Sequence, residues 1–128
     1  MTVEKQPILP HMIRRVPEQF SWLDHRLVRE KYIDQLSHQA SALYLFLVTV
    51  SDNQGLSYYS EKTLSKRLNM DTLSLAEARS ILVQHRLVAY RKPLYQVLAL
   101  EQPRELAQTD SEATSLGQIL QQLAGGVR

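Results

Sequence analysis

The stretch from Tyr58 to Leu100 most constrains what this chain can fold into, because helical and strand-like patterns follow one another there at close spacing. The first pattern predicts a short amphipathic helix over Ser60–Leu68. Ser60 suits the N-cap, and Glu61 lies in the first turn, where the positive end of the helix dipole favours an acid. The run Asn69-Met70-Asp71 then interrupts the helical periodicity.

A second helix is predicted from about Thr72 to Gln84. Its Leu75, Ala78 and Leu82 recur at i, i+3 and i+7, so they point towards one core. Two helices separated by so short a break form a helix-turn-helix.

Two β-prone runs follow, Leu87–Tyr90 and Tyr95–Leu100. They are separated by Arg91–Leu94, in which Pro93 suits a turn and cannot donate a hydrogen bond to a central ladder. A hairpin directly behind a helix-turn-helix is a wing. A short strand over Leu56–Tyr59 is expected to be the third strand of the same sheet.

These segments together resemble winged-helix domains, and the likeness is carried by Tyr59-Ser60, Leu64–Met70, Leu75–Leu82 and Leu87–Tyr90. They are similar above all to the amino-terminal domains of bacterial, phage and plasmid replication-initiation proteins, including DnaD-like primosomal proteins. The resemblance covers the chain from Phe20 to Leu100. It implies a mostly α fold with a small antiparallel β wing (α+β), a winged helix-turn-helix.

The sequence departs from these relatives at the end of the second helix. They usually carry Gly at the position where Arg86 stands here. His85 is expected to take the left-handed conformation instead, since His is among the non-Gly residues that tolerate it.

The remaining segments complete a division into three parts: an extended N-terminal arm over 1–19, the winged-helix domain over 20–100, and a polar linker with a short C-terminal amphipathic helix over 101–128. The arm is expected to be a partly ordered terminus, with docking in a DNA groove or on a partner subunit as the alternatives. Its basic cluster comprises His11, Arg14 and Arg15. The tail helix is expected to dock on its own domain rather than on a partner, through Leu116, Ile119, Leu120 and Leu123.

Two more helices are predicted inside the domain. Ser21 is interpreted as the N-cap of the first, with Phe20 stapled onto its first turn. The second spans Ser37–Ser51 and is apolar nearly all round, so it must be buried on more than one side. Burial by the preceding segment, Phe20–Leu36, is favoured over burial by a second subunit.

The composition narrows the class of protein. The chain has 128 residues, no cysteine and 44% hydrophobic residues, which fits one domain with short extensions and leaves no disulfides or thiolate chemistry. No apolar run reaches the length of a membrane span, and we expect a cytoplasmic protein. The net charge is only +2, but Ser60–Lys92 carries seven bases against three acids. The positive excess therefore lies on the predicted DNA-binding unit.

Catalysis is not predicted. The four histidines lie on separate segments without metal-ligand spacing, and the four glycines form neither a phosphate-binding loop nor a dinucleotide fingerprint. We find no nucleophile elbow and no suggestive pair of carboxylates. A non-enzymatic protein without cofactor or metal is expected.

The favoured function is binding of double-stranded DNA, as a replication-initiation accessory or regulatory factor or a transcriptional regulator. The second helix would enter the major groove, and the wing would reach a neighbouring groove or phosphate. The predicted DNA-binding residues are Lys66, Arg67, Thr72, Ser74, Glu77, Arg79, Arg91 and Lys92. For Arg79 an alternative stays open, in which its guanidinium pairs with an acid inside the fold.

The alternative function is a protein-interaction module in a replication or transposition assembly. Leu73, nearly opposite Leu75 on its helix, favours this alternative because an exposed leucine suits a protein surface. A homodimer is also expected, through the tail face and an apolar flank comprising Ala42, Leu45 and Phe46.

Overall fold

The computed structural model describes residues 3–100, and the predicted C-terminal linker and helix lie outside these residues. Short 3₁₀ turns occur at Pro10–Met12 and Ile33–Gln35. The helices are α1 (Arg26–Arg29), α2 (His38–Val50), α3 (Glu61–Leu68) and α4 (Thr72–Gln84), and the strands are β1 (Leu56–Tyr58), β2 (Val88–Arg91) and β3 (Leu94–Val97). No helix of residues 3–100 is long and apolar enough to cross a membrane.

The three strands form one antiparallel sheet in the order β1-β3-β2, so β3 is central. Arg91 pairs with Leu94, which leaves a two-residue turn, Lys92-Pro93, at the tip of the hairpin. The predicted four-residue connection is therefore too long, and the predicted second strand, which extends to Leu100, ends at Val97 in the structure. The helices and the small antiparallel sheet form the predicted mostly helical α+β fold, and their order is compatible with a winged helix.

A turn through Gly55 fixes where β1 begins. Gly55 has a φ of 83°, its carbonyl accepts a hydrogen bond of 2.8 Å from Val97 N–H, and a Cβ built on it would lie 2.5 Å from Val97 O. Only glycine fits a left-handed residue at so close an approach of two backbones.

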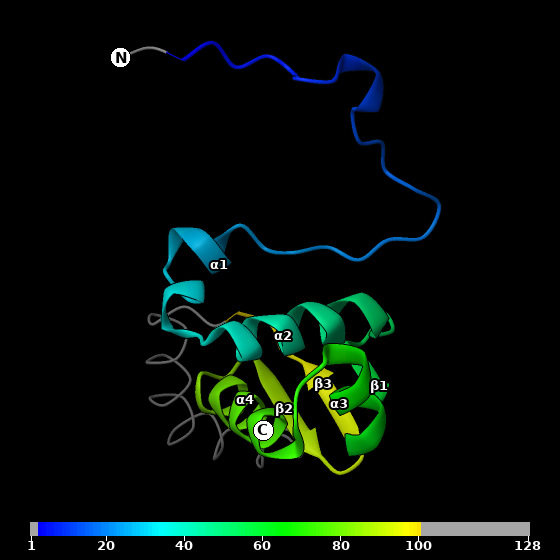
Figure 1. The fold of residues 1–128 in the computed structure, drawn as a ribbon, viewed down its shortest axis with the longest axis vertical. Coiled ribbons are helices and arrows are strands. Elements are labelled where there is room, and N and C mark those ends of the chain that lie inside the picture. Colours follow the sequence, from blue (N-terminus) through cyan, green and yellow to red (C-terminus); the bar gives the residue numbers. More distant parts are fainter. Residues whose placement is uncertain (1–2, 101–128) are drawn as a thin grey trace, which may run out of the picture.

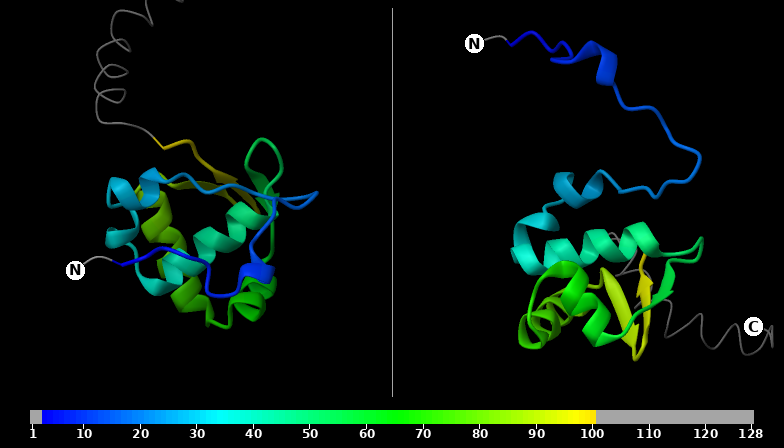
Figure 2. Two further views of the ribbon diagram at one scale, coloured as in Figure 1. Left: turned by 90° about the horizontal axis from the view of Figure 1, so that it is seen from above. Right: turned by 45° about the vertical axis from the view of Figure 1, so that its right-hand side comes forward.

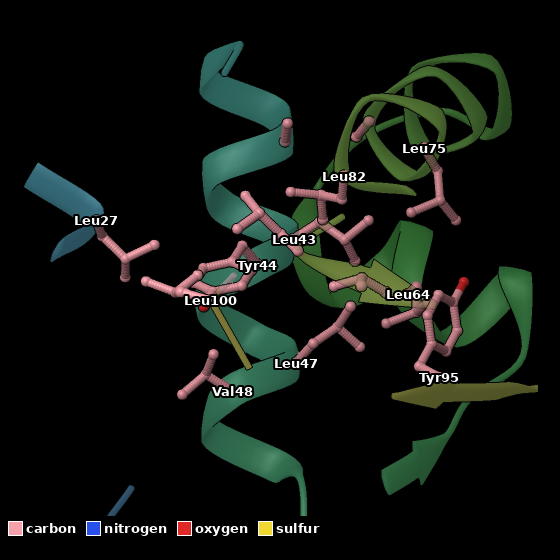
Figure 3. Close-up of a cluster of buried hydrophobic side chains, with 14 residues drawn as sticks. Leu27, Leu43, Tyr44, Leu47, Val48, Leu64, Leu75, Leu82, Tyr95 and Leu100 are labelled. Atoms are coloured by element: carbon pink, nitrogen blue, oxygen red, sulfur yellow. The ribbon is translucent and has the colours of Figure 1, made fainter. Parts of the chain in front are cut away.

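Helix α2 is the centre of the core. Leu43 and Leu47 are fully buried among side chains from α4, α3 and the sheet, including Leu82 and Leu64 (Figure 3). Tyr44 and Val48 lie on another side of α2, with Leu27 and Leu100 around Tyr44 (Figure 3). The chain itself thus covers two sides of this helix, which confirms the expected intramolecular burial.

The apolar flank predicted on α2 is smaller than expected. Phe46 is half-buried, and its ring lies edge-to-face against Tyr59 with 5.2 Å between centroids. Leu45 is 56% exposed and is the main apolar side chain left on this flank.

The prediction that a helix begins at Ser21 is wrong. Residues 20–24 are extended, and the four-residue α1 begins at Arg26. The Asp24 carboxylate accepts a hydrogen bond from Arg26 N–H at 2.8 Å and also pairs with the Arg26 guanidinium. The Asp24 side chain therefore accepts from a backbone N–H in the first turn of α1. The helix begins later in the chain than the pattern at Ser21 indicated. The Ser21 hydroxyl donates instead to the Thr49 carbonyl, 3.3 Å away.

The N-terminal arm leaves the domain on the far side of α2. Every described residue from Val3 to Leu23 is exposed. The arm and α1 lie on one side of α2, whereas α3, α4 and the sheet lie on the other (Figures 1 and 2).

The end of α4 also differs from the prediction. His85 has an ordinary φ of −90°, and Arg86 itself is left-handed with a φ of 58°. The left-handed conformation expected at the end of this helix thus occurs at Arg86 itself. The strained geometry lets Leu87 N–H donate to the Leu82 carbonyl at 3.0 Å, a bond that closes the helix as a C-terminal cap does.

Candidate nucleic-acid interface

The α3–α4 unit is built by local capping. The Ser60 hydroxyl accepts from Thr63 N–H at 3.1 Å, and the Asp71 carboxylate accepts from Ser74 N–H at 2.7 Å. The latter bond lowers the pKa of Asp71 and keeps the capping carboxylate charged. Asn69, with a φ of 55°, ends α3 in the left-handed conformation. These contacts end α3 and begin α4 through residues that are neighbours in the sequence.

Helix α4 buries the predicted face. Leu75, Ala78 and Leu82 are at most 1% exposed. Thr72, Glu77 and Ser80 are exposed, as predicted. Leu73, which is 69% exposed, projects from the same outward side.

Ser74 is the exception among the residues expected on the outside. It is only half-exposed, and it lines a small hollow together with Ser37 and Gln39 at the start of α2. The physical reason is the packing of α4 on α2, which brings this edge of the helix beside the start of α2. The exposed Glu77 borders the same hollow.

The Arg79 guanidinium pairs with an acid inside the fold, which is the alternative that the sequence left open. Its guanidinium donates to the Glu61 carboxylate and, at 3.1 Å, to the Tyr95 hydroxyl. It also lies over the Tyr90 ring, 4.3 Å from the centroid. Burial raises the pKa of Tyr95, so its hydroxyl stays protonated. Arg79 therefore connects α3, α4 and both wing strands, and we assign it to holding the wing in place.

The other predicted basic residues are exposed. Lys66 and Arg67 lie in the last turn of α3, and Arg91 and Lys92 lie at the end of the hairpin. Lys66, Arg91 and Lys92 form no ion pair with a residue of the described part of the chain. The Arg67 guanidinium lies 5.8 Å from the centre of the Phe46 ring, which restrains its stem and leaves the charge at the surface.

A backbone contact adds two residues to this surface. Tyr59 N–H donates to the Pro93 carbonyl at 3.3 Å, so the wing tip lies beside the start of α3. Exposed Lys62, in the first turn of α3, and Tyr58, which is 74% exposed on β1, are at the same end. Sequence reasoning missed both as contact residues, because nothing in the local pattern indicates that the wing tip meets this helix end.

Another hollow lies on the side of the segment before α1. It encloses about 590 Å³ between that segment, the end of α2 and residues 97–100. The Asp24–Arg26 pair lines it, and the hydrogen bonds from Arg26 lower the pKa of Asp24 to about 2. Within residues 3–100 there is no group of three His, Asp or Glu side chains that could hold a metal ion.

Comparison with known proteins gives one structural likeness. No family model and no curated protein sequence matches the chain. A solved structure described as "Structure of Rep-DNA complex" is similar with a TM-score of 0.48 and 15% sequence identity, over 77% of this chain and 89% of that chain.

Proposed function

We propose that this chain is a non-catalytic, cytoplasmic winged-helix protein that binds double-stranded DNA, as an accessory or regulatory factor of the replication-initiation type. The observation that carries the proposal is the distribution of exposed cations around α4. Lys66 and Arg67 lie in the last turn of α3, and Arg91 and Lys92 lie at the tip of the wing. Basic side chains on the two elements that flank an exposed helix face can contact phosphates when that helix lies in the groove of a duplex.

In the proposed complex the amino-terminal half of α4 enters the major groove. Thr72 meets a phosphate at the groove edge, and Glu77 faces the bases. The four cations contact phosphates, which positions the protein on the duplex without reading sequence. Ser74 and Arg79 are left out of the proposed contacts, because Ser74 is partly buried beside the start of α2 and the wing network holds Arg79.

A salt titration of duplex binding tests the proposal. Replacing Arg91 and Lys92 together by Ala should weaken binding about equally on all sequences and lower the salt slope by about 2, since each phosphate contact contributes about one unit. A matched control replaces Lys5 and Arg29 by Ala. Both side chains are exposed, and they belong to the arm and to α1, elements that lie on the far side of α2 (Figure 1). The control should keep the wild-type slope.

Identical slopes for the wild type and the wing variant would show that the wing is not at the phosphates. Absence of binding even at low salt would favour the second candidate, a protein-interaction module in a replication or transposition assembly. The observation in favour of that candidate is Leu73, exposed on the outward side of α4.

A further inference from the structure

The outward side of α4 has an unusual chemistry for a helix that reads DNA. Its first three turns present Leu73, Ala76, Glu77 and Ser80 to solvent, at least in part. Nitrogen donors of the kind that read purines are absent from these four side chains. The one arginine in these turns, Arg79, is engaged with Glu61 and Tyr95.

This set of side chains matches pyrimidines better than purines. Guanine is read by paired donors from Arg or Lys, and adenine by an Asn or Gln amide. Thymine presents a methyl group in the major groove, which apolar side chains contact, and cytosine presents an amino group that a carboxylate accepts. Leu73 and Ala76 supply apolar surface, and Glu77 supplies a carboxylate without a partner in residues 3–100.

We propose, building on the DNA binding proposed above, that this side of α4 is a site for pyrimidine edges in the major groove, with Leu73 contacting thymine methyl groups and Glu77 accepting from cytosine N4. Four residues of helix rise about 6 Å, close to two base steps of about 3.4 Å. Leu73 and Glu77 can therefore read bases near one another in one site.

The surrounding charge favours DNA over a protein as the occupant. The cores of protein interfaces are depleted in lysine, whereas protein–DNA interfaces are strongly positive. Lys66, Arg67 and Lys92 are all exposed on the two elements that flank α4. In this arrangement the apolar Leu73 side chain would contact a thymine methyl group in the major groove, and the surrounding cations would contact the phosphates on either side of it.

Selection of duplexes from a random library with the full chain, followed by replacement of thymine by uracil in the selected site, tests this assignment. Uracil lacks only the methyl group. The wild type should bind pyrimidine-rich sites and lose about fourfold in affinity for each contacted methyl removed, the factor expected for burying one such group. The Leu73→Ala variant should bind the thymine and uracil duplexes equally.

Val83→Ala is the matched control, because Val83 is an apolar residue of α4 that is 43% exposed but lies in the last turn. It should keep the uracil penalty. Equal binding of thymine and uracil duplexes by the wild type would overturn the pyrimidine site and leave DNA binding intact. A chain that selects no duplex at all would overturn both proposals.

Discussion

At the scale of single residues, helix ends are decided by side chains that act on their immediate neighbours. Ser60 and Asp71 each satisfy a backbone N–H three residues ahead. Asn69 ends α3 with a positive φ, which its short polar side chain tolerates. Arg86 also has a left-handed backbone conformation, but it lacks a short polar side chain, and its Cβ makes this conformation strained.

Replacing Arg86 by Gly should therefore stabilise the fold relative to replacing it by Ala. Both variants remove the arginine side chain and its interactions, and only Gly removes the Cβ that crowds the left-handed backbone. We expect the Gly variant to be more stable than the Ala variant by about 1 kcal/mol, measured by urea denaturation. Equal midpoints would mean that Arg86 is not left-handed in solution.

At the scale of elements, the helix-turn-helix and the wing are joined by one apolar contact region and one polar network. Leu82 is fully buried where α4 meets α2 and the sheet. The Arg79 network supplies the polar connection through Glu61 and Tyr95.

Leu82→Ala should destabilise the fold by about 2 to 5 kcal/mol, because it removes buried methyl groups and leaves a cavity between packed elements. Thermal melts of the two proteins measure this effect. The Leu73→Ala variant, altered on the exposed side of the same helix, is the control and should melt near the wild type. An unchanged midpoint for Leu82→Ala would contradict the phase of α4.

Tyr95→Phe should cost about 1 to 2 kcal/mol, because it deletes the hydroxyl that accepts from the charged Arg79 and keeps the ring in the core. Urea denaturation compares it with Tyr58→Phe, which removes the same hydroxyl from an exposed ring. A loss no larger than that of the control would mean that the network does not hold the wing.

At the scale of the whole molecule, most of the large exposed apolar side chains lie on one side of α2. The large exposed apolar side chains concentrate on the arm, the segment before α1, α1 and the outer flank of α2; they include Ile8, Met12, Ile13, Val16, Phe20, Trp22, Leu23, Val28 and Leu45. The exposed cations of α3 and the wing lie beyond the other side of α2 (Figure 1). Contacts between protein subunits are one use of exposed apolar surface.

We expect a homodimer through the apolar side, since twofold association is the commonest way to cover such a surface. Sedimentation of the full chain in the micromolar range should show a dimer. Replacing Ile13 and Leu45 by Asp should shift it towards monomer, whereas Leu73→Asp on the opposite side should not. If the wild type is a monomer throughout this range, the predicted homodimer is wrong.

The sequence by itself determined the elements that rest on neighbouring residues. The bounds of α4, the N-cap of α3, the extent of α2 to within one residue at each end and the position of β1 were predictable, because capping and hydrophobic periodicity act within one or two turns. Ser21 shows the limit of such patterns. A serine followed three residues later by an acid matched the pattern of a helix N-cap, but the helix begins at Arg26.

Only the tertiary structure decided which side chains are available for binding. Nothing in the sequence distinguished Ser74 from other polar residues of α4, and Arg79 was left open between DNA and an acid inside the fold. The packing of the elements places Ser74 beside the start of α2 and Arg79 in the wing network. Lys62 and Tyr58 joined the candidate interface because the wing tip binds the chain at Tyr59, 34 residues before Pro93. Contacts between segments so far apart depend on how whole elements pack, and no local pattern carries that information.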